Sequence, residues 1–461
     1  MLEERWPHQQ EEFEKNVHRP KLALGWEPRL GKTKAAIDFL LEHHPGRVLV
    51  SAPLLVCPQW AEQLEQAGFR VTRGYAFKRK EQFDRALFLT EKIPKRVRPR
   101  RTPLATALVL NVDKLIGNKK LLEYWGPEVY IGDECHQFQN ATSGRTKAMR
   151  SIAAQAPLLR FLSGTMMPNN PGNLWPVMQL IDPANWEPTM KQFRDKHLIC
   201  DYMYPSKIVA IIDPDEIERR LKLCTSRKTR AEVFGPDSTQ ILIRDVPFSK
   251  AGKLLYKTVA DEWVAANEAG QVLDATHALS RLVRLQQISA GYAVFEEKPE
   301  VVDTSKIEAA AQEAVQLVDN EENVAIFYRF KYEERMLLEA LQALGQPPLV
   351  INGGVSGDER HAIVADFNRS KGRILVTQLV AGGIGISLAS ANYALFLTRS
   401  FSYVEDTQAK DRIYAPGQAK CLIFFERPKT IDKYIADILA RKKNMNDALM
   451  SGNLRNIVFG E

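Results

Sequence analysis

The sequence predicts an α/β protein with two domains, each a mostly parallel sheet covered by helices on both faces. Short apolar, β-branched segments alternate with amphipathic helical segments, which is typical of parallel sheets. The chain of 461 residues is too long for one small core. A polar stretch with Gly and Pro breakers, residues 230–238, separates two series of such segments. We therefore expect domains at residues 1–235 and 236–461, the second ending in an amphipathic helix.

Composition and charge fit a globular protein with a modest excess of basic residues. Hydrophobic residues make up 45% and charged residues 26% of the chain, and the formal net charge is +7. This surplus favours polyanionic partners without identifying one. The five cysteines are far apart, which indicates neither a zinc site nor a disulfide framework. The chain begins MLEERWPHQQ and has no long apolar run, so we expect a cytoplasmic protein without a membrane segment.

The first strong motif is a predicted strand, loop and helix within residues 22–40. The apolar run LALG precedes LGKT and then KAAIDFL, whose apolar residues have helical spacing. A strand, a loop and a helix N-terminus in this order form an anion site, because backbone N–H groups and the helix dipole face the phosphates. Lys32 would reach the β- and γ-phosphates of a nucleotide, and the Thr33 hydroxyl would hold Mg²⁺.

This loop departs from the usual G-x-x-x-x-G-K-[ST] pattern, because Trp26 occupies the position of the first glycine. Gly31 keeps the second glycine, and Arg29 adds positive charge beside the phosphates. Upstream, Gln9 has the amide needed to read an adenine edge by a two-way hydrogen bond. A surface glutamine on a helix explains Gln9 equally well, and a Gly-Lys-Thr helix start that binds no ligand is the alternative for the loop.

The second strong motif, EVYIGDECHQFQN at residues 128–140, is an apolar strand that ends in two carboxylates. Carboxylates at this end of a strand lie where parallel α/β sheets bind ligands. Asp133 would hold Mg²⁺ through water, and Glu134 would polarise an attacking water. In the next strand and loop, Ser163 and Thr165 are placed to hydrogen-bond this carboxylate loop, although Ser-Gly-Thr is also a common turn.

A basic segment with interleaved aromatic residues spans Phe77–Pro103. Basic and aromatic side chains together suit a nucleic-acid backbone with its adjacent bases. A solvated charged loop is the alternative. The residues concerned are Lys78, Arg79, Lys80, Arg85, Lys92, Lys95, Arg96, Arg98, Arg100 and Arg101, with Phe77, Phe83 and Phe88.

Taken in order, the motifs resemble those of a known family. LGKT, DECH and SGTMMPN are similar to motifs I, II and III of superfamily 2 helicases, and SAPLLVCPQWAEQLE is closer to motif Ia of the SWI/SNF-type branch of DNA translocases. In the second half, NVAIFYRF resembles motif IV. LVAGGIGIS resembles motif V, where Gly382, Gly383 and Gly385 would let the backbone approach ATP and nucleic acid. The similarity covers about residues 5–445. Over this length the chain resembles the compact motors of phages and bacteria.

QAKDRIYAPGQ, at residues 408–418, resembles motif VI, in which a glutamine is followed by arginines four and seven positions later. Gln408 and Arg412 match this pattern, and Ala415 stands where the second arginine belongs. The resemblance implies a catalytic role for Gln408 and Arg412. Because an arginine finger stabilises charge on the transferring phosphoryl group, we predict that a chain with Ala415 binds ATP but hydrolyses it slowly.

The resemblance implies two RecA-like lobes, with ATP and Mg²⁺ in a cleft between them, in a monomeric ATP-dependent DNA translocase or helicase. ATP binding would close the cleft and hydrolysis would open it. The two lobes, each in contact with the DNA backbone, would then move relative to each other. Contacts to phosphates make such binding independent of sequence. Two alternatives remain, an RNA helicase of the same superfamily and an ATP-dependent DNA clamp without hydrolysis, which Ala415 favours.

Overall fold

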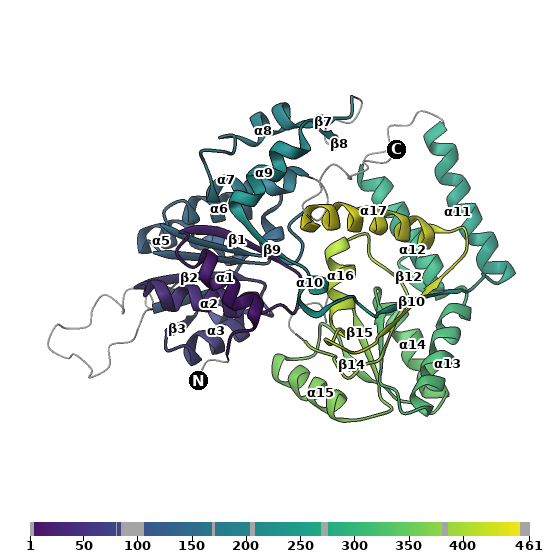
Figure 1. The fold of residues 1–461 in the computed structure, drawn as a ribbon. Helices are drawn as coiled ribbons and strands as arrows, with labels where there is room; N and C mark the ends of the chain where they lie inside the picture. Colours follow the sequence, from purple (N-terminus) through teal and green to yellow (C-terminus); the bar gives the residue numbers. More distant parts are fainter. Residues whose placement is uncertain are drawn as a thin grey trace. The chain divides into compact units, whose positions relative to one another are not determined.

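The computed structural model describes residues 4–79, 81–83, 106–167, 171–202, 208–268, 275–379 and 386–451 (Figure 1). The chain divides into two compact units, one comprising Met1–Pro236 with Arg441–Glu461 and the other comprising Asp237–Ala440. Each unit contains one parallel sheet with helices on both faces, which confirms the predicted fold class.

The first unit is built on a seven-stranded sheet with the order β3-β4-β2-β5-β6-β1-β9. All its pairings are parallel, and β7 and β8 form a separate antiparallel pair. The strands are β1 (Lys21–Trp26), β2 (Arg47–Ala52), β3 (Arg70–Arg73), β4 (Thr106–Asn111), β5 (Val129–Asp133), β6 (Leu158–Leu162), β7 (Leu198–Cys200), β8 (Ile208–Ile211) and β9 (Thr225–Lys228).

Two apolar cores cover the two faces of this sheet. In β2, Val48 and Val50 belong to the core that contains α2 and α3, whereas Leu49 belongs to the core that contains α5, α6 and α7. This alternation is the two-residue period of a strand buried on both faces. Figure 1 shows α2 and α3 on one side of the sheet and α5 and α6 on the other. The helices are α1 (Pro7–Asn16), α2 (Lys32–His43), α3 (Cys57–Gln66), α5 (Lys114–Trp125), α6 (Gly144–Ala153), α7 (Trp175–Ile181), α8 (Met190–His197), α9 (Pro214–Cys224) and α10 (Arg230–Phe234).

The second unit is built on a six-stranded parallel sheet with the order β10-β17-β16-β13-β15-β14. A hairpin of β11 and β12 stands apart from it. The strands are β10 (Gln240–Asp245), β11 (Tyr292–Phe295), β12 (Lys298–Val301), β13 (Val324–Tyr328), β14 (Leu349–Ile351), β15 (Ile374–Gln378), β16 (Tyr393–Phe396) and β17 (Cys421–Glu426).

Helices also cover both faces of the second sheet. One core joins α13 and α14 to alternate residues of the central strands, such as Ile326, and the other joins α15 and α16 to the intervening residues, such as Phe327. The helices are α11 (Lys250–Glu268), α12 (Ala275–Ala290), α13 (Ser305–Asp319), α14 (Lys331–Ala343), α15 (Gly357–Arg369), α16 (Tyr403–Asp411) and α17 (Ile431–Ser451). The residues of α17 from Arg441 on belong to the first unit. None of the helices in the described ranges has the length and apolar character to cross a membrane.

Candidate active site

The predicted phosphate loop lies between β1, which ends at Trp26, and α2, which begins at Lys32. Gly31 is the N-cap of α2 and has a left-handed backbone with φ 77°. No side chain caps this helix end, so its first N–H groups remain available to an anion. The local geometry therefore fits the predicted binding of phosphate.

Trp26 can replace the first glycine of the motif because its side chain points away from the loop. The indole ring is fully buried and donates a hydrogen bond to Ser226 Oγ at 3.1 Å. The carbonyl oxygen of Trp26 accepts a hydrogen bond from Lys32 Nζ at 2.8 Å. Trp26 thus contributes its backbone to the loop and its side chain to the core. Within the loop, Arg29 also adopts a left-handed backbone, with φ 72°.

Helix α1 places Gln9 directly against the phosphate loop. Gln9 Nε2 donates to the carbonyl of Leu30 at 3.3 Å, and its Oε1 accepts from the backbone N–H of Trp6 at 3.0 Å. A Cβ added to Gly31 would lie 2.1 Å from Gln9 Nε2. The left-handed backbone therefore favours glycine at position 31, and a Cβ there would also displace the end of the Gln9 side chain. The role of Gln9 in reading adenine stays a prediction.

The two carboxylates follow β5, at the carboxyl edge of the sheet. Asp133 Oδ1 accepts a hydrogen bond from the backbone N–H of Glu134 at 2.9 Å, and Oδ2 accepts one from Trp60 Nε1 at 2.8 Å. Burial, together with the neighbouring charge of Glu134, raises the pKa of Asp133 above its ordinary value. The positive charge of Lys32 opposes this rise in pKa.

Glu134 takes part in a hydrogen-bonded chain that ends in the loop after β6. Its Oε2 lies 3.2 Å from His136 Nδ1, which in turn lies 3.2 Å from Ser163 Oγ. The same hydroxyl accepts a hydrogen bond from the backbone N–H of Thr165 at 3.0 Å. Although burial alone would raise the pKa of Glu134, the hydrogen bond and charge of His136 hold it below its ordinary value. An ionised Glu134 fits the predicted role of activating water.

The loop after β6 also packs against the phosphate loop. A Cβ added to Gly164 would lie 2.9 Å from Pro28 Cδ, and one added to Gly25 would lie 2.3 Å from Met166 Sδ. Three segments of the first unit thus meet at one edge of the sheet, as the sequence predicts. They are the phosphate loop, the carboxylate loop and the Ser-Gly-Thr loop.

The residues at this edge fit ATP and Mg²⁺. The open N-terminus of α2 and the ammonium group of Lys32 suit phosphate oxygens, and the Thr33 hydroxyl and Asp133 carboxylate are oxygen ligands of the kind Mg²⁺ prefers. Bound there, Mg²⁺ would neutralise negative charge that develops on the phosphates. These ligand roles stay predictions.

The predicted residues of the second unit lie at the end of α16. Gln408 is in the last turns of this helix, and Arg412 caps it. Arg412 is 3% exposed, donates from Nη2 to the carbonyl of Leu379 at 2.9 Å and lies over the ring of Phe327. Burial lowers the pKa of Arg412 to about 9. Ala415 is also buried. The motif V glycines Gly382, Gly383 and Gly385 lie outside the described residues.

Only the start of the basic segment is described. Phe83 is 3% exposed and packs edge-on against Phe77, with ring centroids 4.9 Å apart. Phe83 belongs to the core of the first unit and Phe77 is partly buried against it, so the Phe83 ring is not available to nucleic-acid bases and the prediction is wrong for that residue. For Phe77 it stays a prediction. Lys78 and Arg79 are exposed. Lys80, Phe88 and the basic residues from Arg85 to Arg101 lie outside the described ranges.

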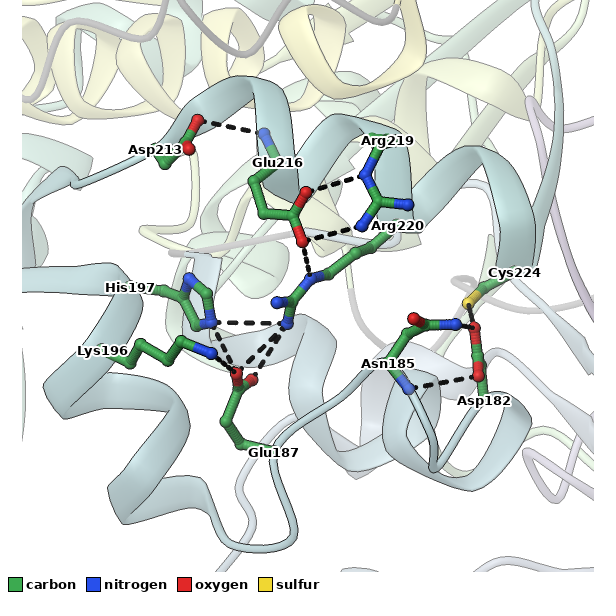
Figure 2. Close-up of polar contacts among 10 residues, drawn as sticks. All are labelled: Asp182, Asn185, Glu187, Lys196, His197, Asp213, Glu216, Arg219, Arg220 and Cys224. Carbon is green, nitrogen blue, oxygen red and sulfur yellow. Dashed lines mark hydrogen bonds and ion pairs between the residues drawn. The ribbon is translucent and has the colours of Figure 1, made fainter.

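A polar cluster in the first unit was not anticipated from the sequence. Figure 2 shows Glu187 between α8 and α9, where it accepts hydrogen bonds from His197 at 2.8 Å, Lys196 at 3.1 Å and Arg220 at 3.2 Å. Against the effect of burial, these hydrogen-bonding partners, His197 foremost, hold the pKa of Glu187 at about 2. Glu187 lies 10 residues before His197 and 33 residues before Arg220, and no spacing pattern signals the cluster.

The fold and the site together define a protein of two parallel α/β sheets with a phosphate loop and an Asp-Glu motif at one sheet edge. Comparison with protein families then identifies the group. The SNF2-related domain matches residues 12–291, more than half of the chain, and the helicase conserved C-terminal domain matches residues 305–417. The chain therefore belongs to the SNF2-related family, which confirms the resemblance seen in the motifs.

The relatives compared with this chain have low sequence identity to it. An uncharacterized ATP-dependent helicase of Mycoplasma pneumoniae is 23% identical over 92% of this chain and 39% of its own length. Chromodomain-helicase-DNA-binding protein 1-like of Danio rerio is 23% identical over 86% of this chain and 38% of its own length. The chain thus spans well under half of these relatives. A solved structure, the Sulfolobus solfataricus SWI2/SNF2 ATPase core in complex with dsDNA, is similar with a TM-score of 0.43 and 19% identity over 99% of this chain and 97% of that one.

Proposed function

We propose that the chain is a DNA-dependent ATPase that uses ATP and Mg²⁺ to move along or remodel DNA. The observation that supports this most is the meeting of Lys32, Asp133 and Glu134 at one sheet edge in a member of the SNF2-related family. The names of relatives describe ATP-dependent helicases and a DNA-binding protein. The basic surplus of +7 suits a DNA backbone as the partner.

In the proposed mechanism, Lys32 and the N-terminus of α2 bind the β- and γ-phosphates, while Thr33 and Asp133 hold Mg²⁺. Glu134 orients and polarises the attacking water, and its lowered pKa keeps it ionised for this role. The contact from Glu134 through His136 to Ser163 would let a shift of the Ser-Gly-Thr loop change the position of Glu134. Gln408 and Arg412 are the candidates for contact with the γ-phosphate from the second unit.

The nature of the nucleic acid separates the first two candidate functions. Steady-state ATP hydrolysis is measured without nucleic acid, with duplex DNA and with duplex RNA of the same sequence. We expect stimulation by DNA and little by RNA. Stronger stimulation by RNA would favour an RNA helicase. Displacement of a third strand from triplex DNA then tests movement along the duplex, and forked against blunt DNA tests strand separation.

A DNA clamp that binds ATP without hydrolysis is the second candidate function, and Ala415 is the observation that favours it. A clamp should bind DNA more tightly with ATP and release no phosphate above background. A motor should release phosphate in a DNA-dependent manner, even if slowly. Phosphate release with duplex DNA therefore decides between the two.

A further inference from the structure

Trp60 of α3 connects the helix after β2 to the acidic loop after β5. Its side chain is fully buried and belongs to the core that also holds Ile37 and Leu40 of α2. From this fixed position, Trp60 Nε1 donates a hydrogen bond to Asp133 Oδ2 at 2.8 Å. The other oxygen, Oδ1, already accepts the backbone N–H of Glu134. Each carboxylate oxygen of Asp133 therefore accepts one hydrogen bond from the protein.

These two donors leave Asp133 with a definite remaining capacity. An ionised carboxylate has about four lone-pair sites for hydrogen bonds. With one site on each oxygen used by the protein, one on each oxygen stays available. Mg²⁺ retains several of its waters in nucleotide sites, and such waters are hydrogen-bond donors. The arrangement suits a carboxylate that holds Mg²⁺ through water and does not rotate.

The chemistry of indole suits this task. The Nε1–H group donates only, so it cannot compete with Asp133 as a metal ligand. The large ring is locked by core packing, which fixes the direction of the N–H bond. Partners that hydrogen-bond a metal-binding carboxylate in this way commonly change metal affinity by 10–100-fold when removed.

We propose that Trp60 is a positioning residue for Mg²⁺, acting by fixing the orientation of the Asp133 carboxylate. This inference rests on the proposed function, because it needs a bound Mg²⁺–nucleotide. It assigns the tryptophan of the PQWAEQLE segment a role in the nucleotide site in addition to its place in the core. A bond that merely satisfies a buried indole is the competing explanation.

The test compares Trp60→Phe with a matched control, Trp175→Phe. Trp175 is also buried in the first unit, at 6% exposure, and donates its indole N–H to the carbonyl of Glu187 at 2.7 Å. Each variant loses the hydrogen bond of one buried indole N–H group. Binding of a fluorescent ADP analogue is titrated in EDTA and then with increasing Mg²⁺, and urea unfolding reports the stability of each variant.

For Trp60→Phe we expect unchanged affinity for the ADP analogue in EDTA and a Mg²⁺ midpoint raised about tenfold or more. For Trp175→Phe we expect a similar loss of stability and an unchanged Mg²⁺ midpoint. An unchanged midpoint in Trp60→Phe, or equal shifts in both variants, would overturn the proposal. If the native chain shows no binding that depends on Mg²⁺, the proposed function itself fails, and the Trp60 role fails with it.

A second replacement guards against misfolding of Trp60→Phe. Substituting 3-benzothienylalanine at position 60 replaces the N–H group by sulfur and keeps the shape of the ring. The Mg²⁺ midpoint should rise in this protein as in Trp60→Phe. A native-like midpoint with native stability would assign the effect of phenylalanine to packing and refute the positioning role.

Discussion

Replacing Gly31 by alanine should destabilise the first unit through two separable effects. The first is the backbone, because Gly31 has φ 77° and a left-handed conformation costs a residue with a Cβ about 1–2 kcal/mol. The second effect is steric, because the new Cβ would lie 2.1 Å from Gln9 Nε2. Gln9 is 5% exposed and holds Leu30 and Trp6 by one hydrogen bond each. Displacing it would cost about 1 kcal/mol for each bond lost.

Together these effects predict a loss of about 2–4 kcal/mol in the free energy of unfolding. Urea unfolding of Gly31→Ala, Gln9→Ala and the double variant separates them. In the double variant the contact with Gln9 is absent, so the two losses should fall short of additivity by about 1 kcal/mol or more. Gly117→Ala is the control, since nothing lies within 4 Å of the added Cβ in α5; it should be neutral or stabilising. Additive losses would contradict a contact between the new Cβ and Gln9, and a loss in Gly31→Ala as small as in the control would contradict both effects.

Three further predictions concern the basic segment, position 415 and the polar cluster. Neutralising Arg96, Arg98, Arg100 and Arg101 together should weaken DNA binding and flatten the dependence of log affinity on log salt; an unchanged slope would make this segment a solvated loop. Ala415→Arg should raise DNA-dependent ATP turnover tenfold or more, towards the roughly 10³-fold effect of an arginine finger, whereas equal rates would mean that position 415 is not the finger position. Because the pKa of Glu187 falls from 4.5 to about 2 on folding, its stabilisation is present above pH about 4.5 and is lost as the pH falls towards 2. Urea unfolding at pH 7 and pH 3.5 should therefore show a smaller acid-induced loss in Glu187→Gln than in the native chain, and equal losses would contradict the assignment.

The sequence predicted those elements whose burial leaves a periodic pattern. β1, α2 and β5 were expected around Lys32 and before Asp133, and they lie there because their apolar residues face two cores. β9 was missed, since TSRK is polar and only half-buried and its place depends on backbone pairing with β1. Local pattern carries no signal for such a strand.

The candidate site likewise has a part that the sequence predicted and a part that it did not. The positions of Lys32 and Glu134 follow from short motifs, because a loop at the end of a strand is fixed by the strand itself. The bond between Trp60 and Asp133 joins residues 73 positions apart, and the bond between Arg220 and Glu187 joins residues 33 positions apart. Such contacts depend on how helices pack on the sheet, and no spacing within the sequence encodes them. The burial of Phe83 was likewise hidden among basic residues.

ATP binding and turnover, measured with duplex DNA in the native chain, Lys32→Ala and Glu134→Gln, test whether these residues form the active site. We predict slow but DNA-stimulated turnover in the native chain, weakened nucleotide binding or turnover in Lys32→Ala, and native nucleotide affinity with turnover lost in Glu134→Gln. The reason for the difference is that the lysine would contact phosphate, whereas the glutamate would act on water. Native rates of hydrolysis in both variants would contradict the assignment of the active site.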